Sequence, residues 1–424
     1  MEGIGRNIMI LLLLEQLHTA FGFKMPMVFT YYSTRMMLSA LTALLISIFL
    51  GPLFIKKLYE LKIGQPIRTE DCPLLGQLHH KKKDTPTMGG VLILASMLVS
   101  MLLWMDLKHV FTLILLVTTL FLGFVGGWDD YLKLRYKNTK GLSSRKKMLC
   151  QVILGAFVAA YLLIPSFAQS LQIGSWFVPP TVKEQIPVKI SLDPEMAKQP
   201  LQTTFIQRSV SLPEYSARLY LPFIKGHVLV FSGVFLFLAA LFIIFVITGT
   251  SNAVNLTDGL DGLAAGCLIL VAACLALIAF VSNHIDIASY LNILYIEGAG
   301  EIAIYLTAFA GACLGFLWYN GHPAQVFMGD TGSLALGGIL GVSAVILKRE
   351  ALLAIIGGIF VAEALSVIIQ VGSYKLRNKK RVFLIAPLHH HFEYKGWPET
   401  KVVVRFWIIG LILAIIGLAS LKFQ

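Results

Sequence analysis

Four polar residues recur at every third position of SNAVNLTDGLDGLAAG, residues 251–266, which lies between two long uncharged runs. They are Asn252, Asn255, Asp258 and Asp261. Residues three apart share one face of a helix, so the two asparagines could converge on one ligand and the two aspartates on another. Gly259 and Gly262 favour instead a break or a tight helix start, which would leave backbone N–H groups exposed. The segment is therefore predicted to hold a group rich in oxygen, a metal ion or both.

Further carboxylates stand in two other segments that contain few other acids. GGWDDYLK carries the adjacent Asp129 and Asp130, and FMGDTGS carries Asp330 just before an apolar run. Adjacent residues diverge by about 100° on a helix, so Asp129 and Asp130 are not expected to coordinate one ion together. Each aspartate alone has an ordinary explanation, because acids often border helix ends. Together with Asp258 and Asp261 they supply the hard oxygen ligands that suit Mg²⁺ or Mn²⁺.

Basic and hydroxyl side chains accompany these acids. Lys82 precedes Thr87 in KKKDTPTMGG, and Lys133 follows Asp129 by one helical turn. Lysines at a membrane border usually set topology or contact lipid headgroups. Beside a cluster of carboxylates and a metal ion, they also suit a phosphorylated substrate.

The remaining candidates are histidines, an amide and an aromatic ring. His389, His390 and His391 are consecutive and must point in different directions on a helix or a strand, which argues against a zinc site. One or two of them could hydrogen-bond a polar or anionic substrate. Phe327 could stack on a base that Asn320 hydrogen-bonds, although aromatics at a membrane interface need no ligand.

The elements that position these residues are predicted to be membrane-spanning helices. Of the 424 residues, 57% are hydrophobic and 14% are charged, whereas soluble domains carry roughly 25% charged residues. We therefore predict an all-α polytopic membrane protein. Ten apolar runs approach spanning length: 34–55, 88–105, 110–127, 149–164, 227–248, 262–281, 302–319, 333–347, 352–372 and 402–421.

Basic residues in short loops predict the orientation of these spans. The loops after the first, third and ninth runs carry seven Lys or Arg each, 21 of the 35 in the chain. The odd-numbered loops are thus predicted to be cytoplasmic, and both termini external. The basic residues that set membrane topology explain most of the net charge of +12, so a nucleic-acid partner is not needed to explain it. All the polar segments named above then share the cytoplasmic face, which predicts a composite site there.

Two segments lie outside this pattern. Residues 1–33 contain an apolar run too short to span, which ends at Glu15 and is predicted to be interfacial. Within the membrane domain, residues 34–424, an external insertion covers about 165–226. Alternation in TVKEQIPVKISLDP predicts a short hairpin there. We expect this insertion to be decorative and the chemistry not to need it.

Five motifs in this order carry a resemblance to a known family: KKKDTPTMGG, DDYLK, NAVNLTDGLDGLA, FMGDTGS and PLHHHFEYKGWPE. From residue 34 to the end, apart from the insertion, the chain resembles the phospho-N-acetylmuramoyl-pentapeptide transferases. These belong to the polyprenyl-phosphate N-acetylhexosamine-1-phosphate transferase superfamily, which shares the aspartate motifs. The triple histidine with YKGWPE is peculiar to the muramoyl-pentapeptide branch. The resemblance implies a multi-pass protein of the bacterial cytoplasmic (inner) membrane.

The resemblance also implies a reaction and roles for the candidate residues. UDP-N-acetylmuramoyl-pentapeptide and undecaprenyl phosphate would give lipid I and UMP, with Mg²⁺, or alternatively Mn²⁺. Asp330 would be the metal ligand and Asp258 the catalytic carboxylate facing it. Asp129 and Asp130 would position the nucleophile or the metal, with a base role or a covalent aspartyl intermediate left open. The implied substrate-binding residues are Lys82, Thr87, Lys133, Asn252, Asn255, Asp261, Asn320, Phe327, His389, His390 and His391.

Two other functions stay open at this point. One is a UDP-N-acetylglucosamine:polyprenyl-phosphate GlcNAc-1-phosphate transferase. The other is a cation-coupled transporter, because Glu363 and Gln370 lie within the ninth run and intramembrane acids often mark ion paths. Transporter sites cluster near the midplane, however, whereas the aspartates named above stand at span ends. The oligomeric state is also open, a homodimer included.

Overall fold

A computed structural model describes residues 8–21, 27–61, 85–136, 141–189 and 203–423. Lys82 falls outside these residues. Nine helices in the described part are long and apolar enough to cross a membrane, which confirms the predicted all-α polytopic class. They are α2 (Tyr32–Glu60), α5 (Val110–Arg135), α6 (Ser144–Leu163), α9 (Leu236–Thr257, after η4, Gly233–Phe235), α10 (Leu263–Ser282), α12 (Ala299–Asn320), α13 (Gly329–Ile346), α15 (Gly358–Leu376) and α17 (Glu399–Ser420).

A shorter apolar helix, α4 (Gly90–Trp104), runs beside them. The remaining helical elements are α1 (Met9–Phe21), η1 (Met27–Thr30), α7 (Pro165–Leu171), α8 (Leu212–Ser216), α11 (Ile285–Tyr290), α14 (Glu350–Ile356), α16 (Leu388–Tyr394) and η5 (Leu421–Phe423). The strands are β1 (Val182–Lys189), β2 (Thr203–Val210), β3 (Arg218–Tyr220), β4 (His227–Val230) and β5 (Tyr295–Ile296).

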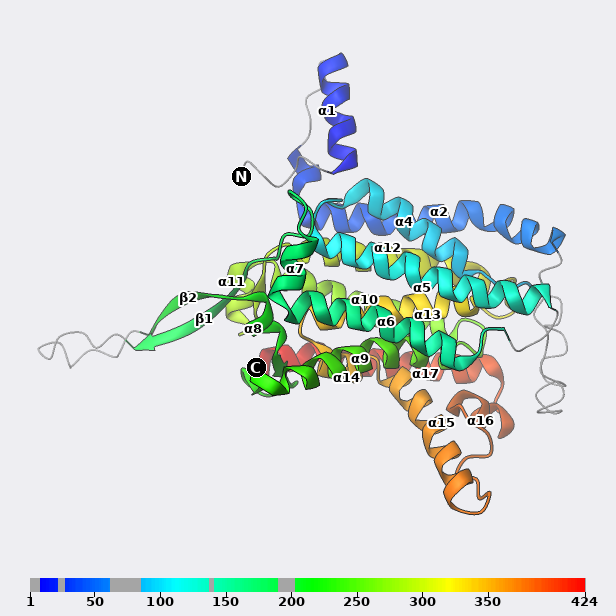
Figure 1. Cartoon of the computed structure of the whole chain (residues 1–424). Helices are drawn as coiled ribbons and strands as arrows, with labels where there is room; N and C mark the ends of the chain where they lie inside the picture. Colours follow the sequence, from blue (N-terminus) through cyan, green and yellow to red (C-terminus); the bar gives the residue numbers. More distant parts are fainter. Residues whose placement is uncertain (1–7, 22–26, 62–84, 137–140, 190–202, 424) are drawn as a thin grey trace, which may run out of the picture.

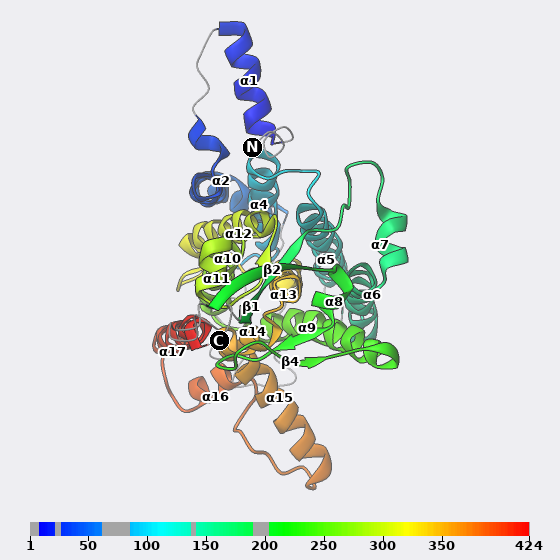
Figure 2. The same cartoon turned by 90° about the vertical axis from the view of Figure 1, so that its left-hand side faces the viewer.

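Helices α12 and α13 form the centre of the bundle (Figures 1 and 2). Helix α12 packs against α2 and α10, while α13 packs against α5 and α9. The glycines of α13 permit this close packing: a Cβ on Gly337 would lie 2.7 Å from the Cα of Ser251 on α9. In a membrane, helices associate by such close backbone approach, since lipid is as apolar as their side chains.

Three of the ten predicted spans differ from the structure. The run 88–105 forms α4, which at 15 residues is shorter than the nine candidate spans of the described residues. Within 227–248, residues His227–Val230 form a strand paired with β3, and the helix that follows continues to Thr257. A short apolar run does not by itself distinguish strand from helix, which explains the error. The run 352–372 is divided at Gly357 into α14 and α15, and α15 tilts away from the rest of the bundle in both views.

Helix α1 crosses the direction of α2 at a steep angle in both views (Figures 1 and 2). It packs against α4, where Ile8 forms a bridge with Asp106, and it continues past Glu15 to Phe21. A helix lying in the membrane surface would take this orientation relative to a spanning helix. The interfacial role of the N-terminal segment stays a prediction.

The external insertion contains the predicted hairpin, but its second strand comes later in the chain than expected. Strand β1 pairs antiparallel with β2 and also with β5, and the hairpin projects from one end of the bundle, hereafter the hairpin end (Figure 1). The buried Lys348 Nζ, just after α13, donates to Ser216 O at 3.0 Å and to Glu350 Oε1 at 2.6 Å. The insertion is thus packed onto the membrane helices, and that the chemistry does not need it stays a prediction.

Shortening the insertion should reduce stability and leave catalysis nearly intact. Arg218, whose side chain is 5% exposed, donates to Glu184 and to Glu214, both at 2.8 Å. Replacing residues 171–214 with a short Gly/Ser linker removes both partners and should cost about 2 kcal/mol of unfolding free energy. We expect a lower melting temperature with a catalytic rate within a few-fold of the parent, and partial recovery of stability on adding Arg218→Met. Lost catalysis at an unchanged melting temperature would contradict this.

Candidate active site

The polar motifs that the structure describes meet at the end of the bundle opposite the hairpin, hereafter the site end (Figure 1). The C-terminal ends of α5, α9 and α12, the N-terminal ends of α10, α13 and α17, and α16 all lie there. This brings together the predicted aspartates and histidines from segments as far as 260 residues apart, Asp129 and His389 among them. The predicted convergence of the loops on one face is confirmed for the described residues.

Backbone pairing joins the segment around Thr87 to the one around Asp330. Phe327 N donates to Pro86 O at 2.8 Å, while Gly89 N and Gly90 N donate to Phe327 O and Met328 O, each at 2.8 Å. Gly329 follows in the left-handed region at φ 74°, where a Cβ would lie 2.7 Å from Asp130 Oδ2 and 2.8 Å from Thr87 Oγ1. Only glycine permits this turn at that position.

Asp129, Asp130 and Asp330 each place a carboxylate oxygen within 4.8 Å of the others. The expectation that adjacent Asp129 and Asp130 would diverge too far is therefore wrong. Asp130 lies against the start of α13, where it accepts hydrogen bonds from the backbone N–H groups of Asp330 (3.1 Å) and Thr331 (2.9 Å) and from the Thr331 hydroxyl (2.7 Å). Asp129 accepts from Leu142 N at 2.6 Å. Asp330 lies in the first turn of α13. Because α13 begins beside Asp130, its first turn brings the Asp330 carboxylate to Asp129 and Asp130 on α5.

Two lysines neutralise most of this charge. Lys133 Nζ lies 2.6 Å from Asp129 Oδ2 and 3.1 Å from Asp330 Oδ2. Lys147 Nζ, from α6, lies 2.8 Å from Asp330 Oδ2 and 3.3 Å from Asp129 Oδ2. The sequence analysis missed Lys147, whose only signal was its place in the basic run after Asp129.

The donor set of this cluster fits a divalent cation. Three carboxylates supply hard oxygen ligands, and the buried Asp129 Oδ2 is in close contact with Lys133 and Lys147. Mg²⁺ is commonly held by one or two carboxylates together with substrate phosphates and waters.

Asp258 caps the C-terminus of α9 and faces the start of α13, where the Gly329 N–H donates to its carboxylate. Burial, with the neighbouring charges of Asp330 and Asp130, raises the pKa of Asp258 to about 7. An aspartate at its reference pKa of about 3.9 would be a weak general base. At a pKa near 7, a carboxyl can accept and release a proton at neutral pH.

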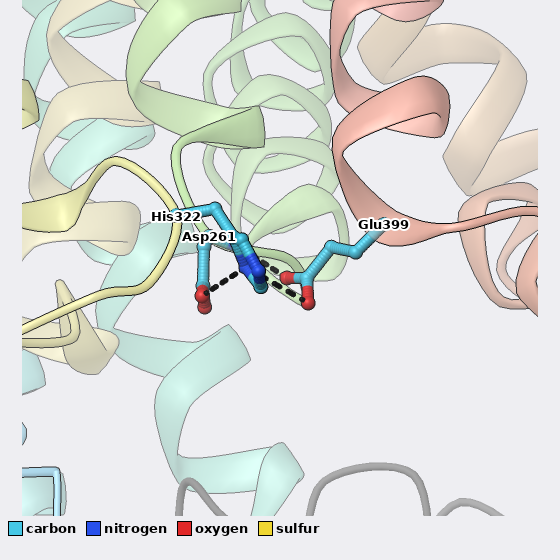
Figure 3. A group of neighbouring side chains, drawn as sticks. All are labelled: Asp261, His322 and Glu399. Carbon is cyan, nitrogen blue, oxygen red and sulfur yellow. Dashed lines mark hydrogen bonds and ion pairs between the residues drawn. The ribbon is translucent and has the colours of Figure 1, made fainter.

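Asp261 points to a different group of residues, so the two aspartates of DGLDG do not converge on one ligand. Asp261 Oδ2 accepts from Ala324 N at 3.1 Å and lies 3.0 Å from His322 Nδ1, which is 3.5 Å from Glu399 Oε2 (Figure 3). The predicted break is confirmed: Gly262 is left-handed at φ 79° and starts α10. Asp261, His322 and Glu399 also have ligand types that a metal accepts.

The backbone N–H groups that this break was expected to expose already have protein partners. Asp261 N donates to Glu399 Oε1 at 2.7 Å, and Gly262 N donates to Asn320 Oδ1 at 3.0 Å. Asn320 also donates to Val326 O at 2.8 Å. These bonds hold the 258–262 turn against α12 and α17. Glu399 and His322 are further residues that sequence reasoning missed, although Glu399 stands in the quoted YKGWPE motif.

The other predicted residues lie on α9 and in the segments that lead into α4 and α13. Asn252 is half-buried on α9 and donates to Gln151 Oε1 at 2.7 Å and Thr248 O at 2.8 Å, so it lies toward α6. Asn255 is half-buried one turn later, Phe327 is partly exposed, and Thr87 is buried against Gly329.

The three histidines point in different directions, as predicted. His389 is 1% exposed and turns inward, with its ring against Gly259. His390 Nδ1 lies 2.7 Å from Glu393 Oε2, and His391 Nδ1 accepts from Leu384 N at 3.2 Å. Only the first of the three faces the turn that carries Asp258.

The sequence matches known protein families and named relatives. A family model described as glycosyl transferase family 4 matches residues 196–348, and signature 1 of phospho-N-acetylmuramoyl-pentapeptide-transferase matches residues 82–94. The chain is 68% identical over 98% of its length, and 100% of the relative, to the phospho-N-acetylmuramoyl-pentapeptide-transferase of Protochlamydia amoebophila (strain UWE25). It is 45% identical to that of Desulfotalea psychrophila over 97% of this chain and 99% of the relative. For that of Thermodesulfovibrio yellowstonii, the identity is 46% over 94% of this chain and 95% of the relative. Full-length identity at this level, together with a shared signature over the buried Thr87 segment, shows that the chain belongs to the phospho-N-acetylmuramoyl-pentapeptide-transferase family.

Proposed function

We propose that the chain transfers phospho-N-acetylmuramoyl-pentapeptide from its UDP derivative to undecaprenyl phosphate, giving lipid I and UMP. The observation that carries the proposal is the cluster of Asp129, Asp130 and Asp330 with Lys133 and Lys147 at the end of a membrane-spanning bundle. One substrate is a soluble anion and the other is a phosphate on a lipid tail. A charged site at a membrane surface is where the two can react.

The cluster suits a reaction between two phosphorylated substrates. Mg²⁺, when bound by Asp330 with Asp129 and Asp130, would neutralise charge on the phosphates. Lys133 and Lys147, which now pair with these carboxylates, would then be released to bind phosphate oxygens. Phosphoryl transfer depends mainly on such positioning and charge stabilisation.

Asp258 is our candidate for handling the proton of the attacking lipid phosphate. That phosphate loses its second proton near pH 6, so a base is needed only for the protonated fraction. Burial, the largest cause of the raised pKa of Asp258, favours this task, and its carboxylate faces Asp330. Positioning remains the role that we assign to Asp129 and Asp130.

The donor nucleotide is placed beside the 258–262 turn. Asp261 and Asn320 make hydrogen bonds at this turn, and we assign them to the uridine part together with Asn255 and Phe327. Thr87, Asn252 and Lys82 stay proposed substrate contacts. His390 and His391 are assigned to the sugar-phosphate or peptide portion, beside His389.

The site end is assigned to the cytoplasmic side of the inner membrane. The basic loops that predict orientation follow α2, α5 and α15, all of which end there. UDP-linked precursors occur in the cytoplasm, so the proposed donor requires this side. A homodimer stays a prediction, which a mass measurement in detergent would test.

Release of UMP tests the proposed function directly. Purified protein, undecaprenyl phosphate and Mg²⁺ should release UMP with UDP-N-acetylmuramoyl-pentapeptide and should be nearly inert with UDP-N-acetylglucosamine. Chelation of the metal should stop the reaction, and addition of Mg²⁺ should restore it. The reverse donor preference would assign the chain to GlcNAc-1-phosphate transfer instead. Ion-dependent uptake into vesicles without any UMP release would favour a transporter.

A further inference from the structure

A buried acid within a membrane span has no role in the mechanism described so far. Glu363 lies on α15 and is 0% exposed. Burying a carboxylate is costly unless it is paired and hydrogen-bonded. The contacts that Glu363 makes therefore indicate the role of this side chain.

Glu363 contacts the first of the three histidines twice. Its Oε1 accepts a hydrogen bond from His389 N at 3.1 Å, and its Oε2 lies 3.2 Å from His389 Nδ1. Helix α15 holds the preceding segment in the same way. Gln370 Oε1 accepts from Val382 N and Phe383 N at 3.0 and 2.9 Å, and Ser373 Oγ donates to Lys380 O at 2.9 Å. Polar side chains of α15 thus fix the backbone of the chain that leads into α16.

The other edge of the His389 ring faces the candidate active site. A Cβ on Gly259 would overlap His389 Nε2, so the ring occupies the space that a side chain at position 259 would need. Gly259 follows Asp258 directly. Both ring nitrogens of His389 are buried and have no hydrogen-bond partner among the described residues, but Nδ1 lies at ion-pair distance from Glu363 Oε2. With Nδ1 against Glu363, Nε2 is the ring nitrogen left to contact a ligand.

We infer that Glu363 is a positioning residue for the transfer reaction: it fixes His389 so that Nε2 meets the diphosphate of the donor beside Asp258. This inference rests on the proposed function. A carboxylate behind an imidazole sets which nitrogen carries the proton and how the ring is oriented. The same contacts explain Gly259, since the ring fits only if that position lacks a side chain. The contacts with His389 also give a role to Glu363, the intramembrane acid that had kept a cation-coupled transporter open as an alternative.

The test is a set of variants in full-length protein. Glu363→Gln keeps the size of the side chain and an acceptor for His389 N but removes the charge. Glu363→Gln and His389→Asn should each lower kcat/KM for UMP release by about tenfold to a hundredfold, the cost typical of losing an orienting partner. The double variant should be no slower than His389→Asn alone, because residues that act through one another are not additive. Ser366→Ala, a buried change one turn along α15, is the matched control and should match the parent.

Gly259→Ala provides an independent arm that leaves Glu363 untouched. It should displace the ring and lower kcat/KM as much as His389→Asn does, with no further loss when the two are combined. Gly259→Ala and His389→Asn should lower the melting temperature, because the first overpacks the turn and the second leaves the buried Glu363 carboxylate without its partner, so rates are compared well below the lowest melting temperature. Full activity of Glu363→Gln or of Gly259→Ala, or losses that multiply in either double variant, would overturn the inference.

Binding of UDP, measured by calorimetry without lipid phosphate, separates this inference from the proposed function. Glu363→Gln should weaken UDP binding by the same factor as His389→Asn. If the parent releases no UMP from the muramoyl donor, the proposed function fails, while equal weakening of UDP binding would still support the pairing. Unchanged UDP affinity in Glu363→Gln would refute the pairing whatever the parent's activity.

Discussion

Asp330→Asn should lower turnover by on the order of a thousandfold, the scale seen when a preorganised electrostatic contact is removed from an active site. The variant replaces a charged oxygen ligand, which also pairs with Lys133 and Lys147, by a neutral amide. UMP release at saturating donor and limiting Mg²⁺ measures the effect. The backbone N–H of residue 330 still donates to Asp130, so the start of α13 should keep its place.

Metal binding gives a readout of Asp330 that does not depend on turnover. A ligand that binds only the folded protein stabilises it in proportion to the logarithm of its concentration over Kd. Mg²⁺ should therefore raise the melting temperature of the parent and raise that of Asp330→Asn much less. Asp286→Asn, an exposed acid on α11 at the hairpin end, is the control and should behave like the parent. Near-normal turnover in Asp330→Asn at limiting Mg²⁺ would rule out Asp330 as the metal ligand.

Gly126→Ala should disable the site through packing alone. Helix α5 passes α13 so closely that a Cβ at residue 126 would overlap the backbone carbonyl oxygen of Asp330. The helices must move apart, and overpacking of this kind costs about 1–3 kcal/mol of stability. The movement also separates Asp129 and Asp130 from Asp330, and a displacement of about 1 Å can cost about a hundredfold in rate. We expect kcat/KM to fall by about that factor.

Gly127→Ala, at the next residue of the same helix, is the matched control. A Cβ there would be 3.7 Å from the nearest atom of Thr331, an ordinary contact. Because alanine favours a helix more than glycine does, this variant should be as active as the parent and slightly more stable. Equal rates for the two variants would show that the close approach of α5 and α13 does not hold the carboxylates in register.

Several features of this protein were accessible from its sequence. The apolar runs predicted a polytopic helical protein, because spanning a membrane requires long uncharged helices. The motif order predicted the family, and the glycines at 259 and 262 predicted the break between α9 and α10. The divergence of the three histidines followed from backbone geometry alone. Each of these depends on local pattern, which a sequence displays directly.

Tertiary structure alone decided which side chains meet. The sequence places Asp258 and Asp261 three residues apart, yet the break at Gly259 turns one toward Asp330 and the other toward His322 and Glu399. Lys147, one cation in a basic run, was not distinguishable until α6 brought it to Asp330.

The same holds for Glu363 and for the external insertion. Glu363 and His389 are 26 residues apart and make contact because α15 and α16 fold back on each other. Arg218 and Lys348 pair with acids and backbone groups that the alternation of the insertion does not indicate. Contacts of this kind arise from packing between helices, and packing depends on the shapes of both partners. A pattern within one segment therefore specifies the helix and its apolar or polar face, while the neighbour that each polar atom meets is set by the fold as a whole.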